Sequence, residues 1–232
     1  MTLIKFLKKY LFRKDFHYKV KEKISIYIRK NFKDPYKDQR YLVGDKDKII
    51  IFDIGSHIGD TVKNYKSIFP NSQIFAFEPS EKSYQRLLEE FGEDKEILIS
   101  KNALSNKCKI KTLFLSSSDK LNSLKKPNKR AWGFEKKKTI TVETDTIDNY
   151  CAKNFIKYIT ILKLDVQGSE LDVLEGAESM LSLGKIDLVY IEWQVVPLYE
   201  NHSLYYEIGN YLGQFGYELF NLYNINEARS GQ

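Results

Sequence analysis

The sequence predicts an α/β fold with a mostly parallel sheet and helices on both of its faces. From residue 49 onward, short runs rich in β-branched and aromatic residues alternate with segments of helical periodicity, which is the pattern of βαβ units. The first run ends in Asp53 and is followed by two glycines four residues apart, as in a nucleotide-binding βα turn. A chain of 232 residues that is 42% apolar can bury one substantial core.

Each predicted element rests on its own pattern of apolar residues. Short apolar runs predict strands at 49–54, 73–78, 96–102, 159–166, 186–192 and 217–222. Apolar residues at helical spacing predict helices at 58–68, 80–91, 169–182 and 203–214. After the third strand the alternation stops, and residues 110–115 and 139–143 predict a β pair within an insertion of about residues 110–143. Each parallel connection is expected to be right-handed.

Residues 1–48 predict a basic, amphipathic helical extension that precedes a domain of residues 49–232. The extension holds 15 Lys or Arg against 6 Asp or Glu, whereas the rest of the chain holds 22 against 25. Such a helix can make peripheral membrane contact through residues 1–30, or it can pack across the domain with its lysines in water. Because the domain itself is mildly acidic, nucleic acid is not an expected partner.

The sequence also bears on the cellular compartment. No run approaches 18 consecutive apolar residues, and the N-terminus lacks the apolar core and cleavage site of a signal peptide. Cys108 and Cys151 have neither the spacing of a metal site nor the number of a disulfide framework. We therefore expect a cytoplasmic protein, with peripheral attachment at the inner face of the membrane as the alternative, and no metal held by thiols.

The turn after the first predicted strand indicates which ligand the domain binds. Glycines let a backbone approach a nucleotide, and Glu78 follows Asp53 by 25 residues, where a carboxylate can accept hydrogen bonds from ribose hydroxyls. A carboxylate at Asp53 would repel a diphosphate but would suit an ammonium group. S-adenosylmethionine carries an ammonium and a ribose with two free hydroxyls, and it therefore fits this turn better than NAD.

Polar residues end five of the predicted strands. They are Asp53, Glu78, Asn102, Asp165 and Glu192. Ligands of open parallel sheets bind outside the carboxyl ends of the strands, so these side chains are expected to converge on one rim. The alternative for each of them is a structural role as the cap of the following helix.

Several segments, in chain order, carry the motifs of a known family. They are Asp53-Ile54-Gly55-Ser56-His57-Ile58-Gly59, Glu78-Pro79, Asn102-Ala103-Leu104-Ser105, Asn122-Ser123-Leu124, Thr146-Ile147-Asp148, Leu162-Lys163-Leu164-Asp165-Val166-Gln167-Gly168-Ser169-Glu170-Leu171 and Val173-Leu174-Glu175-Gly176-Ala177. In these segments the chain resembles the FkbM-type S-adenosylmethionine-dependent methyltransferases over about residues 49–232. Two positions depart from the family pattern, which usually has asparagine at His57 and glutamate at Gln167.

The resemblance implies a Rossmann-like class I methyltransferase sheet and a role for each matched residue. Asp53 and the turn residues Gly55, Ser56, His57 and Gly59 would hold the methionyl part of S-adenosylmethionine. Glu78 and Pro79 would meet the ribose, Asn102 and Ala103 would flank the adenine, and Asp165 would lie near the methyl group. The family normally supplies one more strand after residues 217–222, so the last strand of the sheet is predicted to be missing.

The expected reaction is O-methylation of a hydroxyl on a sugar, a glycan or a related secondary metabolite. A hydroxyl is a weak nucleophile, so a base must take its proton. Asp165 is the first candidate, His57 the second because its pKa suits neutral pH, and Glu192 the third. A divalent cation between Asp165 and Glu192 is an alternative that is not expected.

The lysine-rich segment 120–138 could receive a phosphorylated or nucleotide-linked glycan, or it could be a solvated loop.

Two other functions remain open. The chain could bind S-adenosylmethionine without catalysing transfer, or it could methylate an amine of protein or nucleic acid. The second is less favoured, because the Asn/Asp-Pro-Pro-Tyr/Phe motif that holds a planar amine is absent after Asp165.

Overall fold

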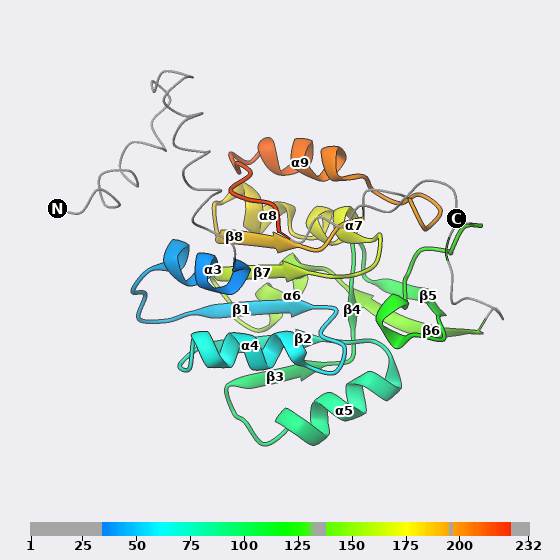
Figure 1. Cartoon of the computed structure of the whole chain (residues 1–232), viewed down its shortest axis with the longest axis horizontal. Coiled ribbons are helices and arrows are strands. Elements are labelled where there is room, and N and C mark those ends of the chain that lie inside the picture. The colour runs from blue at the N-terminus through cyan, green and yellow to red at the C-terminus, as the bar shows by residue number, and fades with distance from the viewer. Residues whose placement is uncertain (1–33, 130, 132–137, 195–196, 224–232) are drawn as a thin grey trace. The chain divides into compact units, whose positions relative to one another are not determined.

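The computed structural model describes residues 34–129, 131, 138–194 and 197–223 (Figure 1). Residues 43–219 form one structural unit, and the described residues 34–42 and 220–223 belong to another. The helix predicted within residues 1–30 lies outside the described residues, as do residues 130 and 132–137 of the lysine-rich segment. Within the predicted extension the structure describes one helix, α3 (Pro35–Val43).

The domain is built on a five-stranded sheet in which every strand pair is parallel. Its strands are β1 (Ile50–Ile54), β2 (Gln73–Phe77), β3 (Ile97–Ser100), β7 (Ile159–Leu164) and β8 (Ile186–Ile191). They lie in the order β3-β2-β1-β7-β8, and their arrowheads point the same way in Figure 1. The carboxyl ends of the strands therefore form one rim, as the sequence predicted.

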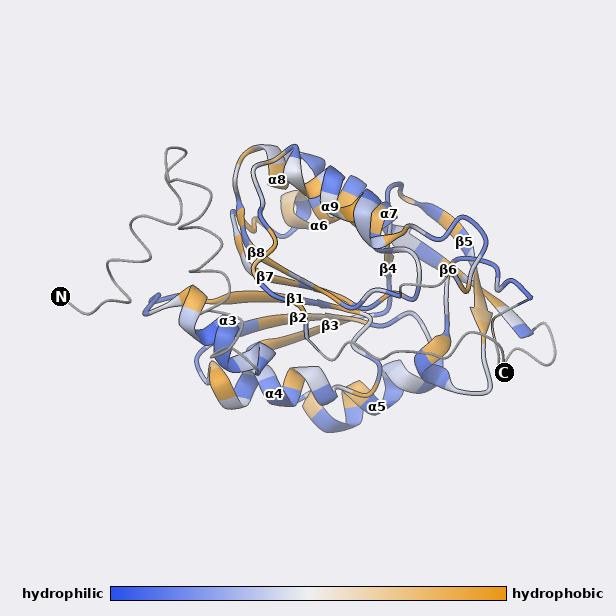
Figure 2. Ribbon diagram, turned by 45° about the horizontal axis from the view of Figure 1, so that its top comes forward, coloured by the Kyte–Doolittle hydropathy of each residue, from blue (hydrophilic) through white to orange (hydrophobic). Residues whose placement is uncertain are grey.

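Helices cover both faces of this sheet, which confirms the predicted fold class. Figure 2 shows α4 (Asp60–Ile68) and α5 (Glu81–Phe91) on one face. The other face carries α6 (Ile147–Lys153), α7 (Glu170–Glu175), α8 (Glu178–Ser182) and α9 (Tyr205–Gly213). Every residue of β1 and β7 is buried, as expected for strands covered on both sides. The main core lies on the α6–α9 side, where the rings of Phe52, Phe75 and Phe77 surround Tyr150.

A second, three-stranded sheet forms from the insertion. It consists of β4 (Ala103–Leu104), β5 (Lys109–Leu115) and β6 (Lys138–Asp145), in the order β4-β6-β5. The β5–β6 pair is antiparallel and confirms the pair predicted at 110–115 and 139–143. Its small core consists of Ala103, Leu113 and Val142. A 3-10 turn, η1 (Asp119–Leu121), lies in the connection that follows β5.

The strand predicted at 217–222 is wrong, since these residues form no strand. Leu219 and Leu222 are 66% and 44% exposed, so the apolar run is not buried as a strand of this sheet would be. Tyr217 instead contributes its side chain, whose hydroxyl donates to the carbonyl of Ile186 at 2.5 Å. The ring of Tyr217 packs against the main core.

The helix predicted at 169–182 is two helices, α7 and α8, with a break at Gly176. A Cβ added to Gly176 would lie 2.1 Å from the carbonyl oxygen of Ser105, so the chain passes too closely for any side chain. The carboxylate of Asp148 accepts the backbone N–H groups of Ser179 and Met180 at 2.8 and 3.0 Å. It thereby caps the N-terminus of α8 from a distant part of the chain. No helix of the described residues is long and apolar enough to cross a membrane.

Candidate functional site

The turn after β1 is held against the neighbouring strands by its backbone. The N–H groups of Gly55 and Ser56 donate to the carbonyl of Phe77 at 3.0 and 3.1 Å. Gly55 has a φ of 78°, and a Cβ at this position would lie 1.9 Å from the carbonyl oxygen of Asp165. The Ser56 hydroxyl donates to the carbonyl of Asp53 at 2.7 Å. A glycine is therefore required at position 55 because the turn passes directly over the end of β7.

His57 and Gly59 complete the turn in different ways. His57 has a φ of 50°, which aims its backbone N–H at Glu78 Oε2, 2.9 Å away. Burial lowers the pKa of its half-buried imidazole, and the nearby Lys120 lowers it further. A Cβ on Gly59 would lie 2.3 Å from the ring of Phe91, so this glycine makes room for α5. Its predicted contact with the cofactor stays a prediction.

Glu78 is a buried carboxylate in a fixed orientation at the end of β2. Its Oε2 accepts the N–H of His57, and its Oε1 accepts the N–H of Ser80 at 2.9 Å. Burial raises the pKa of Glu78 to about 7, although both backbone N–H groups oppose this rise. Each carboxylate oxygen keeps a lone pair, so the group can still accept two ligand hydroxyls. Pro79, which follows, is half-buried.

Beneath the rim, Asp53 forms a buried ion pair with Lys163 of β7. The Nζ atom of Lys163 lies 2.9 Å from Asp53 Oδ1 and donates to the carbonyl of Gly55 at 3.0 Å. Burial raises the pKa of Asp53, and the charge of Lys163 opposes that rise. Burial disfavours the charge on Lys163, but Asp53 and the carboxylates of the rim hold its pKa above the ordinary value. Lys163 therefore balances the charge of Asp53 within the protein, while the predicted contact with a ligand ammonium stays a prediction.

Asp165 and Glu192 lie together at the ends of β7 and β8. Asp165 is the largest cause of the raised pKa of Glu192, ahead of burial, and Lys163 opposes the rise. Lys163 Nζ lies 3.8 Å from Asp165 Oδ2. The structure thus brings the first and third candidate bases together beside one cation. Among the described residues, no three His, Cys, Asp or Glu side chains form a group that could hold a metal ion.

Asn102 and Ala103 lie beyond the end of β3, where the chain enters the second sheet. The N–H of Asn102 donates to the Ser100 hydroxyl at 3.3 Å. Ala103 is 5% exposed, and its methyl group packs against Leu113 and Val142 in the small core of the second sheet. Their predicted position beside an adenine stays a prediction.

Two residues that link the site together were given no role by the sequence analysis. Lys163 is one, although a lysine inside the apolar run 159–164 signals a buried counter-charge. The other is Gln167, whose Nε2 donates to Asp165 Oδ1 at 2.8 Å and whose Oε1 accepts from Gln194 Nε2 at 2.8 Å. Gln167 has no comparable sequence signal, because its partners come from separate loops.

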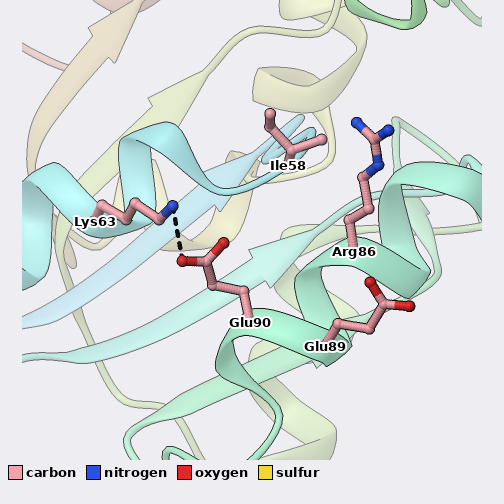
Figure 3. Close-up of a pocket in the computed structure, with 5 residues that line it drawn as sticks. All are labelled: Ile58, Lys63, Arg86, Glu89 and Glu90. Atoms are coloured by element: carbon pink, nitrogen blue, oxygen red, sulfur yellow. Dashed lines mark ion pairs between the residues drawn. The ribbon is translucent and has the colours of Figure 1, made fainter.

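A hollow in the surface next to the glycine turn is lined by other residues. Figure 3 shows this shallow space of about 290 Å³, lined by Ile58, Lys63, Arg86, Glu89 and Glu90. Lys63 and Glu90 form an ion pair of 2.7 Å within it. The lining comes from α4, α5 and the turn before α4, and it includes none of the predicted site residues.

Comparison with known proteins identifies the family. The methyltransferase FkbM domain matches residues 53–219, which run from the end of β1 to beyond α9. The chain is also similar to a 2-O-methyltransferase, NoeI, of Sinorhizobium fredii (strain NBRC 101917 / NGR234). The two are 26% identical over 166 residues, which cover 67% of this chain and 68% of that relative. The matched region contains both the glycine turn and the rim carboxylates, and the chain therefore belongs to the FkbM methyltransferase family.

Proposed function

We propose that this methyltransferase transfers the methyl group of S-adenosylmethionine to a hydroxyl of a sugar or glycan. The observation that carries the proposal is the Glu78 carboxylate, fixed by two backbone N–H groups at the end of β2. A buried carboxylate with free lone pairs suits two ribose hydroxyls. Its neighbour is the glycine turn, which the Gly55 conformation brings close to the end of β7.

The residues present fit this cofactor. Glu78 would accept the ribose hydroxyls, the turn of residues 55–59 would face the methionyl part, and Asn102 would approach the adenine. When bound, S-adenosylmethionine supplies a methyl group activated by a sulfonium. Much of the rate enhancement then comes from holding the acceptor oxygen in line with that methyl group.

Asp165 is the proposed base. It follows strand β7, which lies between β1 and β8. It would take the hydroxyl proton as the acceptor oxygen forms its bond to the methyl carbon and the bond from that carbon to sulfur breaks. Glu192 lies beside it and remains the third candidate. His57 remains the second, since its lowered pKa leaves the imidazole able to accept a proton at neutral pH.

A hydroxyl acceptor is favoured by the similarity to NoeI, which is named a 2-O-methyltransferase. The described lysines Lys120 and Lys129 are exposed on the insertion. They could contact a phosphate of a nucleotide-linked or lipid-linked glycan. By contrast, Lys125 is occupied by an ion pair of 2.8 Å with Asp172 of α7, which joins the insertion to the domain.

The test is transfer of label from methyl-labelled S-adenosylmethionine to a panel of acceptors. The panel contains monosaccharides, nucleotide sugars and lipid-linked oligosaccharides, together with protein and nucleic acid as amine acceptors. We expect label on a carbohydrate hydroxyl, and its loss by at least about 100-fold in Asp165→Asn. Asp187→Asn, at the opposite end of β8, is the matched control and should keep full activity. Label on amines alone, or bound cofactor with no transfer to any hydroxyl, would contradict the proposal.

A further inference from the structure

The loop after β7 holds Gln167 in an unusual backbone conformation. Its φ is 53°, in the left-handed region that non-glycine residues seldom adopt, and Gly168 follows with a φ of 94°. The Ser123 hydroxyl donates to the Gln167 carbonyl at 2.7 Å and anchors this loop to the insertion. Gln167 is 8% exposed, so a polar side chain is buried here and must find partners.

The partners of Gln167 fix the direction of its side-chain amide. Its Nε2 donates to Asp165 Oδ1 at 2.8 Å, and its Oε1 accepts from Gln194 Nε2 at 2.8 Å and from the Tyr199 hydroxyl at 3.4 Å. Burial raises the pKa of Tyr199, so its hydroxyl keeps the proton. An ionised carboxylate only accepts, so a reversed amide would place an oxygen against Asp165. The contact with Asp165 therefore favours the arrangement in which Nε2 faces the carboxylate.

Tyr199 connects this network to the loop after β8. It is 2% exposed, and its single hydroxyl proton is shared between the carbonyl of Leu121 at 3.1 Å and Gln167 Oε1 at 3.4 Å. The same loop pairs with the insertion through the bridge between Pro127 and Tyr199 and the bond from Asn128 N–H to the Leu198 carbonyl at 3.0 Å. Both loops next to the rim thus converge on the residue that contacts Asp165.

We propose that Gln167 is a positioning residue that holds the Asp165 carboxylate in one orientation and ties it to the loop containing Tyr199. This inference rests on the proposed function, since Asp165 is the proposed base. Without the amide, the remaining side-chain partners of Asp165 would be Lys163, whose Nζ lies 3.8 Å from Oδ2, and the neighbouring carboxyl group of Glu192. The charged or titratable groups around Asp165 are Lys163, Asp53, Glu192, Glu170 and Tyr199, and Lys120 acts on the neighbouring Glu192.

A double-mutant cycle in the full chain tests the contact. Gln167→Glu places a second carboxylate against Asp165, and Asp165→Asn then restores a donor and an acceptor with their directions exchanged. We expect Gln167→Glu to raise the unfolding equilibrium constant by about tenfold or more at pH 8. Asp165→Asn should then lower the unfolding equilibrium constant of the Gln167→Glu variant. Its effect on that constant should be more favourable to the folded state, by at least about tenfold, than its effect in the wild type. Urea-induced unfolding measures all four proteins.

The pH dependence separates positioning from a general structural role. The loss caused by Gln167→Glu should shrink at pH 5, where protonation relieves the repulsion between carboxylates. Ser123→Ala is the matched control, because it weakens the same loop without touching the Asp165 contact. Its cost should be independent of pH and unaffected by Asp165→Asn. Additive effects of Gln167→Glu and Asp165→Asn at both pH values would overturn the proposal.

If Gln167→Glu does not fold, Gln167→Leu completes the cycle without adding charge. The effect of Asp165→Asn on the unfolding constant should then differ between the wild type and the Gln167→Leu variant, and equal effects would overturn the contact. Calorimetric titration of S-adenosylmethionine onto Gln167→Leu keeps the two proposals distinguishable. We expect unchanged affinity, because Gln167 contacts the proposed base and not the proposed ribose site. If the wild type binds no S-adenosylmethionine, the proposed function fails, while the cycle still decides the role of Gln167.

Discussion

The two sheets of the domain achieve stability in different ways. At the carboxyl end of the five-stranded sheet, two acidic side chains are buried and held within the protein: Asp53 pairs with Lys163, and Glu78 accepts two backbone N–H groups. In the three-stranded sheet, most side chains of β5 and β6 are exposed or half-buried, and Ile110 is 71% exposed. We infer that the proposed cofactor side tolerates little change, whereas the insertion can vary its surface without loss of the fold.

The largest expected effect comes from breaking the buried ion pair at the rim. Lys163→Met leaves Asp53 buried without its counter-charge, and we expect a loss of about 3–5 kcal/mol in the free energy of unfolding. The control is Lys46→Met, which breaks the half-exposed pair with Asp187. That change should cost about 0–1 kcal/mol. Urea-induced unfolding at pH 7 measures both variants. Equal losses in the free energy of unfolding would contradict the claim that the buried ion pair contributes more than the exposed one.

The raised pKa of Glu78 predicts how stability depends on pH. Its pKa of about 7 in the folded state exceeds the ordinary value of 4.5, so the folded state holds the proton more tightly. Stability should therefore fall as the pH rises from about 4.5 to about 7 and then level off. A pKa difference of this size corresponds to about 3 kcal/mol.

Glu78→Gln isolates this contribution. Glu170, whose pKa burial also raises to about 7, adds a decline over the same pH range, so Glu78→Gln should make the decline shallower without abolishing it. Thermal or urea unfolding between pH 4 and pH 8 measures the slope. Glu89→Gln, on the exposed surface of α5, should leave it unchanged. If stability fell with pH as steeply in Glu78→Gln as in the wild type, the raised pKa of Glu78 would be contradicted.

The smallest effect on stability is expected in the insertion. Replacing Lys120 and Lys129 together by glutamine should change the free energy of unfolding by less than about 0.5 kcal/mol, because both are exposed. If these lysines meet a phosphate of the acceptor, the same variant should raise KM for that acceptor and leave cofactor affinity unchanged. Steady-state kinetics with an acceptor from the panel makes the comparison. A large loss of stability would show that the insertion surface is not free to vary.

The parallel sheet could be predicted from sequence because its strands are continuous apolar runs bounded by turn residues. The run at 217–222 is also rich in aromatic and aliphatic residues, but tertiary packing uses Tyr217 as a side-chain donor and leaves Leu219 exposed. The helix break at Gly176 depends on the approach of Ser105, which lies 71 positions away in the chain. Local periodicity carries no information about such contacts.

The site residues could be predicted from sequence where their positions relative to the strands show their role. Glu78, Asp165 and Glu192 could be placed on the rim because each directly follows a strand, whereas Asp53 lies inside β1 and beneath the rim. Lys163 interrupts an apolar run and could have been paired with an acid on a neighbouring strand. Gln167 could not be assigned, because its partners Gln194 and Tyr199 reach it only through the folded loops.

Calorimetric titration of S-adenosylmethionine at pH 8 onto the wild type, Glu78→Gln and the control Glu81→Gln tests the central claim most directly. NAD is titrated onto the wild type for comparison. Since charge-assisted hydrogen bonds contribute about 1.5–3 kcal/mol each, Glu78→Gln should weaken binding of S-adenosylmethionine by about 10- to 1000-fold. Glu81→Gln should bind as the wild type does, and NAD should not bind. Equal affinity of the wild type and Glu78→Gln for S-adenosylmethionine would contradict the assignment of Glu78 to the ribose.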